Sequence, residues 1–72
     1  MKVQEIIVGS SRLLVREEDG AKYVLYHPSL SVAISLGHPQ YLAFLEWSVG
    51  TLDLKSPFLS SVEFICARLQ LK

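Results

Sequence analysis

The chain has 72 residues, half of them hydrophobic and 19% charged, and its seven basic residues balance seven acidic ones. This length allows one domain at most, covering residues 1–72. The neutral balance argues against a duplex DNA binder, which usually carries a strong basic surplus.

The apolar content is high for so small a chain. A domain of this size buries only about 60% of the surface that its unfolded chain exposes. Cys66 is the single cysteine, so an internal disulfide cannot add stability. The sequence also has no ligand cluster for a structural metal, so oligomerisation or a permanent partner is the remaining common source of stability. A self-made interface is the simpler way to cover the apolar excess, and we therefore expect a homo-oligomer, most simply a dimer.

The N-terminal segment and the hydropathy pattern indicate the compartment in which the protein is expected. The segment after Met1 has no apolar run long enough for a signal peptide, and no run approaches the roughly 18 apolar residues that span a membrane. A lone cysteine fits a reducing compartment. The sequence thus predicts a soluble, cytoplasmic protein without a membrane partner.

Three strands are expected in the first part of the chain, at residues 3–8, 12–17 and 22–27, and the first of these is rich in β-branched residues. Gly9-Ser10-Ser11 forms the first turn. Asp19-Gly20 between two strand-like runs is a strong hairpin signal. Pro28 ends the third strand because proline cannot donate to a sheet.

Residues 31–36 alternate between small and larger apolar side chains, with Val32, Ile34 and Leu36 on one side. This period of two predicts a fourth strand with one buried face. A helix is the alternative, since Leu30, Ala33 and Ile34 also follow a helical spacing.

Two helices are expected in the second part, at residues 39–49 and 57–70. Pro39 suits the first position of a helix and Gly50 its C-terminal end, and Ser56-Pro57 has the pattern of an N-cap followed by proline. The sequence therefore predicts an α+β fold: an antiparallel three- to four-stranded meander within residues 1–36, then two helices packed on one face.

The hairpin turn divides the sheet into two expected faces. A two-residue turn at Asp19-Gly20 would place Glu18 opposite Ala21 and Glu17 opposite Lys22. The core face would then carry Leu13, Val15, Val24 and Tyr26, joined by Ile6 and Val8. The outer face would carry Arg12, Arg16, Tyr23 and His27 around the apolar stripe Ile7, Leu14 and Leu25.

The expected outer face allows three interpretations. It could be an ordinary amphipathic surface. It could bind a protein, with Leu14 and Leu25 giving apolar area and Arg12, Arg16, Tyr23 and His27 giving anchors. It could also bind a single-stranded nucleic acid, which would stack on Tyr23 and bind Arg12 and Arg16.

The helices carry a second expected contact surface. In the second helix, Phe58, Val62, Ile65 and Leu69 share the core stripe, with Leu59 and Cys66 beside it. Phe64, Ala67 and Leu71 fall on the far side, either against the linker or in an interface. The first helix is apolar nearly all round, so Trp47 or Phe44 should face outward. We expect Phe64, Ala67, Leu71, Trp47 and Phe44 to mediate self-association.

Chemical motifs are weak. His27 and His38 each precede a proline and lack a third ligand at zinc-type spacing. Cys66 lies on the expected core face of its helix, beside the core stripe. Gly9-Ser10-Ser11 lacks the spacing of a phosphate loop, and the acidic run 17–19 suits a solvated turn. We expect no catalytic residue, no metal and no cofactor.

These patterns favour a non-enzymatic protein-interaction module, a small regulator, inhibitor or accessory subunit that self-associates and docks on a larger protein. The alternative is a small nucleic-acid-binding regulator that uses the basic and aromatic sheet face.

Overall fold

The computed structural model describes residues 2–20 and 22–71, which form an α+β fold as the sequence predicts. The four strands are β1 (Lys2–Val8), β2 (Ser11–Glu18), β3 (Lys22–His27) and β4 (Val32–Gly37). The helices are α1 (His38–Ser48) and α2 (Leu59–Leu69). The strands pair antiparallel in the order β1-β2-β3-β4, so β1 and β4 are the edge strands.

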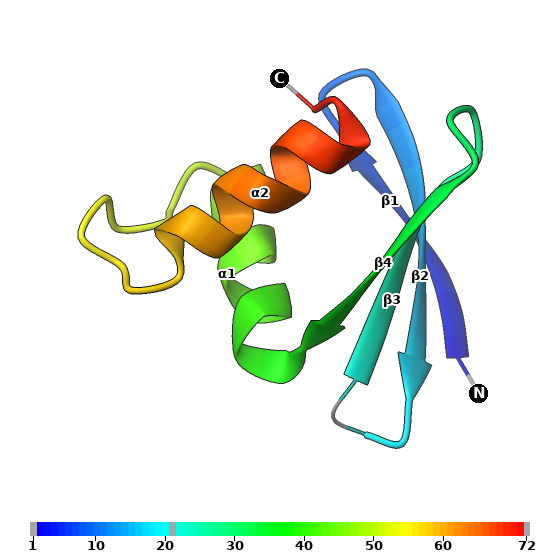
Figure 1. Cartoon of the computed structure of the whole chain (residues 1–72), viewed down its shortest axis with the longest axis horizontal. Coiled ribbons are helices and arrows are strands. Elements are labelled where there is room, and N and C mark those ends of the chain that lie inside the picture. The colour runs from blue at the N-terminus through cyan, green and yellow to red at the C-terminus, as the bar shows by residue number, and fades with distance from the viewer. Residues whose placement is uncertain (1, 21, 72) are drawn as a thin grey trace.

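The sheet and the helices form two layers. Figure 1 shows the sheet nearly edge-on, with both helices on the same side of it. Helix α1 follows β4 directly and contacts β3 and β4, and α2 contacts α1 and β4. The opposite face of the sheet has no helix over it in the described part of the chain. We call the face under the helices the inner face and the opposite one the outer face.

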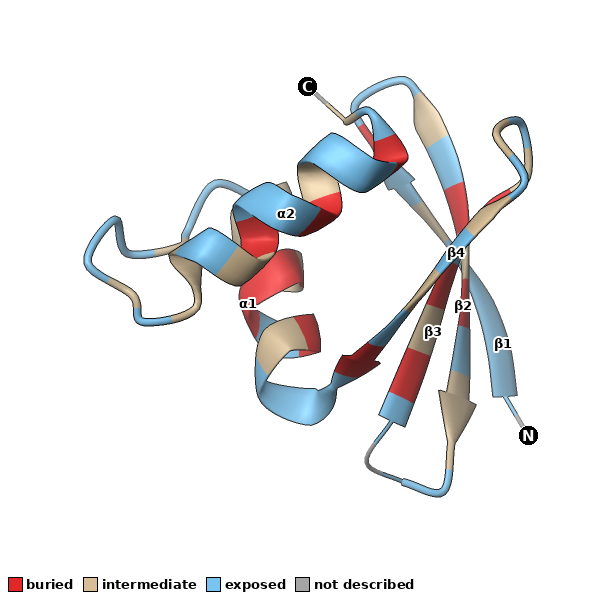
Figure 2. Ribbon diagram, in the orientation of Figure 1, coloured by how far each residue is buried: buried red, intermediate tan, exposed pale blue. Residues whose placement is uncertain are grey.

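The core lies between the inner face and the helices. Buried residues alternate with more exposed ones along β2 and β3, as a sheet with one covered face requires (Figure 2). Phe44 of α1 is fully buried at the centre of this core. The sheet contributes Val8, Leu13, Val15, Tyr23, Leu25 and Leu36, and the helices contribute Tyr41, Phe44, Ile65 and Leu69.

The fourth strand and the helices follow the prediction closely. The strand interpretation of residues 31–36 is confirmed, and its larger side chains, Val32, Ile34 and Leu36, contact the core. Helix α1 ends at Ser48 with Val49 as its C-cap, and Gly50 follows in a left-handed conformation (φ +79°). The Thr51 N–H donates to the Glu46 carbonyl over 2.8 Å. A glycine takes this conformation without the steric cost that a side chain brings.

The start of the second helix differs from the prediction. Helix α2 begins at Leu59, after the expected Pro57, and its N-cap is Phe58 without a side-chain cap. The Ser56 hydroxyl instead accepts from the Phe58 N–H over 3.1 Å, and the Leu59 N–H donates to the Ser56 carbonyl. Ser56-Pro57 therefore forms a turn that leads into the helix.

The register of the central hairpin also differs. Glu18 pairs with Lys22 and Glu17 with Tyr23, so three positions, 19–21, separate the paired residues. The predicted pairing of Glu17 with Lys22 is wrong, and the predicted pairing of Glu18 with Ala21 lies outside the described residues. A shift of one residue exchanges the two faces of a strand, so every side chain of β3 lies on the face opposite to the expected one.

Candidate interaction surfaces

The outer face combines apolar and charged side chains. Strand alternation and the observed registers place there Val3, Glu5 and Ile7 from β1, Arg12, Leu14 and Arg16 from β2, Val24 and Tyr26 from β3, and Ala33 and Ser35 from β4. Val3 and Ile7 are each 62% exposed and Tyr26 is 37% exposed. Three of the large exposed hydrophobic residues of the molecule thus share this face.

A shallow depression of about 180 Å³ marks the centre of the outer face. Its side chains come from three adjacent strands, because Leu14 pairs with Tyr26 and Arg16 lies between Val3 and Val24. Cross-strand neighbours of this kind lie within contact distance of each other. The result is an apolar centre that no other described element covers.

Two ion pairs flank this apolar centre. The Arg12 guanidinium donates to the Glu5 carboxylate from the neighbouring strand. In the second pair, Nη2 of Arg16 lies 3.0 Å from Oε2 of Glu18. These pairs are largely exposed, so each contributes about 0–1 kcal/mol to stability. Their main consequence is electrostatic: each arginine has a carboxylate beside it, which leaves little net positive charge on the face.

The expected outer face is wrong for three of its residues. Tyr23, Leu25 and His27 lie on the inner face and are buried, because the three-position separation in the hairpin turns β3 over. Arg12, Leu14 and Arg16 lie on the outer face as expected. Val24 and Tyr26, expected in the core, occupy the outer face instead.

Tyr23 belongs to an aromatic cluster below the helices. Its ring stacks on that of Tyr41 with centroids 4.1 Å apart and an angle of 16° between the planes. A hydrogen bond of 3.3 Å joins its hydroxyl to Nδ1 of His38, at the start of α1. Burial raises the pKa of Tyr41, and the proximity of Tyr23 and Glu17 raises it further. The cluster joins β3 to α1.

His27 lies at the opposite end of β3 and is 8% exposed. Its Nδ1 has no hydrogen-bond partner among the described residues. The structure thus places both His27 and Tyr23 where a partner on the outer face cannot reach them.

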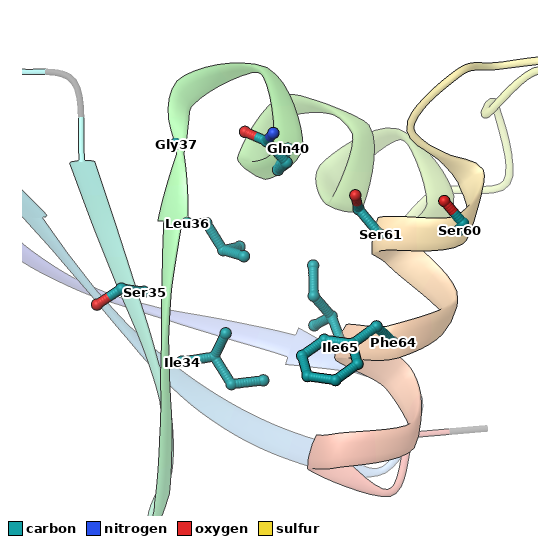
Figure 3. A pocket seen from close by; sticks show the side chains of 9 residues that line it. All are labelled: Ile34, Ser35, Leu36, Gly37, Gln40, Ser60, Ser61, Phe64 and Ile65. Carbon is teal, nitrogen blue, oxygen red and sulfur yellow. The ribbon is translucent and has the colours of Figure 1, made fainter.

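A second hollow lies between strand β4 and helix α2 (Figure 3). We call it the β4–α2 groove; its volume is about 560 Å³. Ile34 and Leu36 point from β4 toward Phe64 and Ile65 of α2. The lining has no charged side chain and consists of Ile34, Ser35, Leu36, Gly37, Gln40, Ser60, Ser61, Phe64 and Ile65.

The residues expected to mediate self-association fall into three groups by exposure: surface, partly buried and fully buried. Phe64, which is 60% exposed, and Ala67 lie on the surface of α2. Leu71 and Trp47 are partly buried and pack against the core. The expectation that Phe44 reaches the surface is wrong, because α1 turns it into the space between the sheet and α2, where it contacts Trp47 with ring centroids 5.7 Å apart.

The helical period of the sequence predicts that Phe64 is exposed, as it is, but it does not indicate the groove beside it. A signal was present: residues 23–45 contain no Asp, Glu, Lys or Arg. Edge strands usually carry such residues. An uncharged strand at a sheet edge therefore points to a contact along that edge.

The titratable side chains give little sign of a reactive centre. Within residues 2–20 and 22–71, no three His, Cys, Asp or Glu side chains lie close enough to hold a metal ion. Cys66 is partly buried, and burial raises the pKa of its thiol, with a further contribution from Glu63. A raised pKa lowers the fraction of thiolate, which is the nucleophilic form.

Comparison with protein-family models, curated proteins and solved structures finds no match for this chain. Neither of the two helices in the described ranges has the length and apolar character that a membrane span needs.

Proposed function

We propose that the protein is a non-enzymatic protein-interaction module, a small regulator, inhibitor or accessory subunit that associates with its own copy and docks on a larger protein. The observation that carries this proposal is the apolar centre of the outer face, which lies exposed between two Arg–Glu pairs. Protein interfaces have this anatomy of an apolar centre and a polar rim.

Tyr26 is the proposed anchor of the docking surface. It is the tyrosine of this face, and it lies beside Leu14 in the depression. Tyrosine is enriched among the residues that dominate binding energy, because its ring gives a large rigid contact and its hydroxyl a polar end. A partner with an apolar patch would bury this ring and leave the ion pairs at the rim.

The alternative is a nucleic-acid-binding regulator on the same face. The observations support it less, because Arg12 and Arg16 already have carboxylate partners and Tyr23 and His27 are buried. A phosphate would have to displace Glu5 or Glu18. Salt separates the two proposals: phosphate contacts weaken steeply as salt rises, whereas an apolar contact does not.

The same docking role fits a cytoplasmic protein that works without a cofactor. The single cysteine fits the reducing cytoplasm, and we propose that the protein acts there. It would need no cofactor, since docking depends on surface shape and apolar area alone.

Tyr26→Glu tests the docking surface. We expect the tagged wild-type chain to retain a protein partner from its native cell, and the Tyr26→Glu chain to lose it. Leu54→Glu is the matched control, because Leu54 is 81% exposed in the segment before α2, away from the outer face. Equal retention by all three chains would contradict the proposal, and retention that nuclease abolishes would favour the nucleic-acid alternative.

A further inference from the structure

Strand β4 is an unprotected sheet edge. It pairs with β3 on one side, and its other side borders the β4–α2 groove. Natural edge strands usually discourage pairing with charged residues, proline or bulges. The other edge strand, β1, carries Lys2 and Glu5, whereas β4 reads Val-Ala-Ile-Ser-Leu-Gly. Apart from its ladder with β3, β4 makes no backbone hydrogen bond among the described residues, so this edge is available to another strand.

The lining of the groove is uncharged, and this limits the kind of strand that can occupy it. None of the nine lining residues is charged, so a charged side chain placed there would lose water without gaining a partner. The matching occupant is an uncharged strand with alternating apolar residues. Strand β4 of a second copy has this composition, since it lies within the charge-free stretch 23–45.

We propose that two copies join edge to edge through β4, forming one continuous antiparallel sheet. This inference rests on the self-association in the proposed function and specifies its interface. A two-fold axis perpendicular to the sheet keeps both helix layers on one side. Inward-facing residues must then oppose inward-facing residues, which all have even numbers in β4.

The symmetric register centres on Ile34. Ile34 then opposes its own copy, Val32 opposes Leu36, and Ala33 opposes Ser35. Each of these pairs is apolar or small, and none brings like charges together.

Phe64 lies beside this axis. It lines the same groove as Ile34 (Figure 3). In the symmetric pair, the phenylalanine of each copy would therefore approach the axis from its helix. Specific interfaces bury at least about 1,000 Å² in total, or roughly 500 Å² per copy. That share is close to a tenth of the 4765 Å² surface of the chain.

A strand pair alone gives a narrow contact, and the groove with Phe64 widens it, because Ser60 and Ser61 allow a close approach.

Charge exchange at residue 34 tests the register. Ile34→Lys and Ile34→Glu each place like charges face to face across the axis. Light scattering on a sizing column should show the wild type at twice the chain mass of 8.1 kDa and each variant at the chain mass. An equimolar mixture of the two variants should return to the double mass, because Lys then faces Glu.

A cysteine at the same position gives an independent reading that does not depend on adding a charge. In a Cys66→Ser background, Ile34→Cys should form a disulfide between copies on mild oxidation, since opposed residues of antiparallel strands lie about 4.5–5.5 Å apart at Cα. Ile7→Cys in the same background is the matched control on β1 and should not cross-link.

The outcomes distinguish the two proposals. A wild-type mass of 8.1 kDa overturns both self-association and the β4 pairing. A double mass that persists in both Ile34 variants, or cross-linking of Ile7→Cys without cross-linking of Ile34→Cys, overturns the β4 pairing alone. Circular dichroism with wild-type strand and helix signals shows that each variant is folded.

Discussion

Phe44 stabilises the fold by filling its centre. It is fully buried between the sheet and α2, although its helix is apolar on most sides. Phe44→Ala should therefore lower the free energy of unfolding by about 3–5 kcal/mol, the usual cost of removing a buried aromatic side chain. Leu42→Ala on the same helix is the control, with an expected cost below about 1 kcal/mol because Leu42 is 47% exposed. Urea denaturation measures both, and equal costs would contradict this assignment.

Ionisation of Tyr41 should destabilise the folded protein at alkaline pH. Its pKa is raised in the folded protein, chiefly by burial, so folding favours the neutral phenol. The contribution of the neutral Tyr41 to the free energy of unfolding is complete below the pKa of the unfolded chain, about 10. It is lost as pH rises from there through the raised pKa of the folded protein. The wild type should lose stability above about pH 10. Tyr41→Phe keeps the stacked ring and should lose less, with Tyr26→Phe as control; identical pH profiles for all three chains would refute this role.

Cys66 should react slowly with thiol reagents. Burial raises the pKa of its thiol, and Glu63 raises it further. Less thiolate is then present at any given pH, so labelling should be slow and should accelerate as pH increases. Glu63→Gln should lower the thiol pKa and speed the reaction. Leu54→Cys in a Cys66→Ser background gives the rate of an exposed thiol, and a native Cys66 that matched it would contradict the prediction.

The β2–β3 hairpin depends on two left-handed residues, Asp19 (φ +50°) and Gly20 (φ +70°). Gly20→Ala should cost about 1–2 kcal/mol, since the left-handed conformation brings Cβ close to the following carbonyl. Space is not limiting, because an added Cβ meets nothing within 4 Å.

Gly37→Ala is the control for the hairpin glycine. Gly37 has an ordinary φ of −75°, and an added Cβ would meet the end of the Gln40 side chain, which can rotate away. Thermal denaturation should rank Gly20→Ala as the less stable variant. The reverse order would show that the turn conformation is not the limiting feature.

The elements were predictable from local patterns, whereas the strand faces were not. Alternation at Val32, Ile34 and Leu36 identified β4, and Pro39 and Gly50 identified the ends of α1 within a residue or so. The faces of β3 depend on whether two or three positions form the turn. Both choices bury apolar side chains, Val24 and Tyr26 in one case and Tyr23 and Leu25 in the other, so hydrophobicity could not decide between them.

The candidate sites were predictable to the extent that they depend on a single element. Arg12, Leu14 and Arg16 share a strand, so their common face followed from alternation alone. Phe64 and Ala67 followed from the helical period in the same way. The β4–α2 groove requires the tertiary placement of two segments about 30 residues apart, which no local pattern contains.

At the scale of the molecule, the helix layer covers one face of a sheet that carries exposed apolar side chains on the other face as well. The chain therefore presents two distinct surfaces: the outer face, with its depression between Leu14 and Tyr26, and the uncharged edge of β4 beside Phe64. They point in different directions, so association through the β4 edge would leave the outer face free. A dimer would then carry two outer faces side by side, and a partner could bind both with increased avidity.

Self-association should contribute directly to stability, because a chain of this length has a small core of its own and a single cysteine. If two folded copies are in equilibrium with two unfolded chains, the thermal midpoint should rise by about 3–5 °C for each tenfold increase in concentration. Scanning calorimetry over a hundredfold range of concentration measures this slope. Phe64→Glu should abolish it by placing a charge beside the axis, whereas Leu42→Glu, on α1 and away from the groove, should preserve it. A midpoint independent of concentration in the wild type would mean that the fold is stable as a single copy, and the exposed Phe64 would then belong to a contact with a different protein.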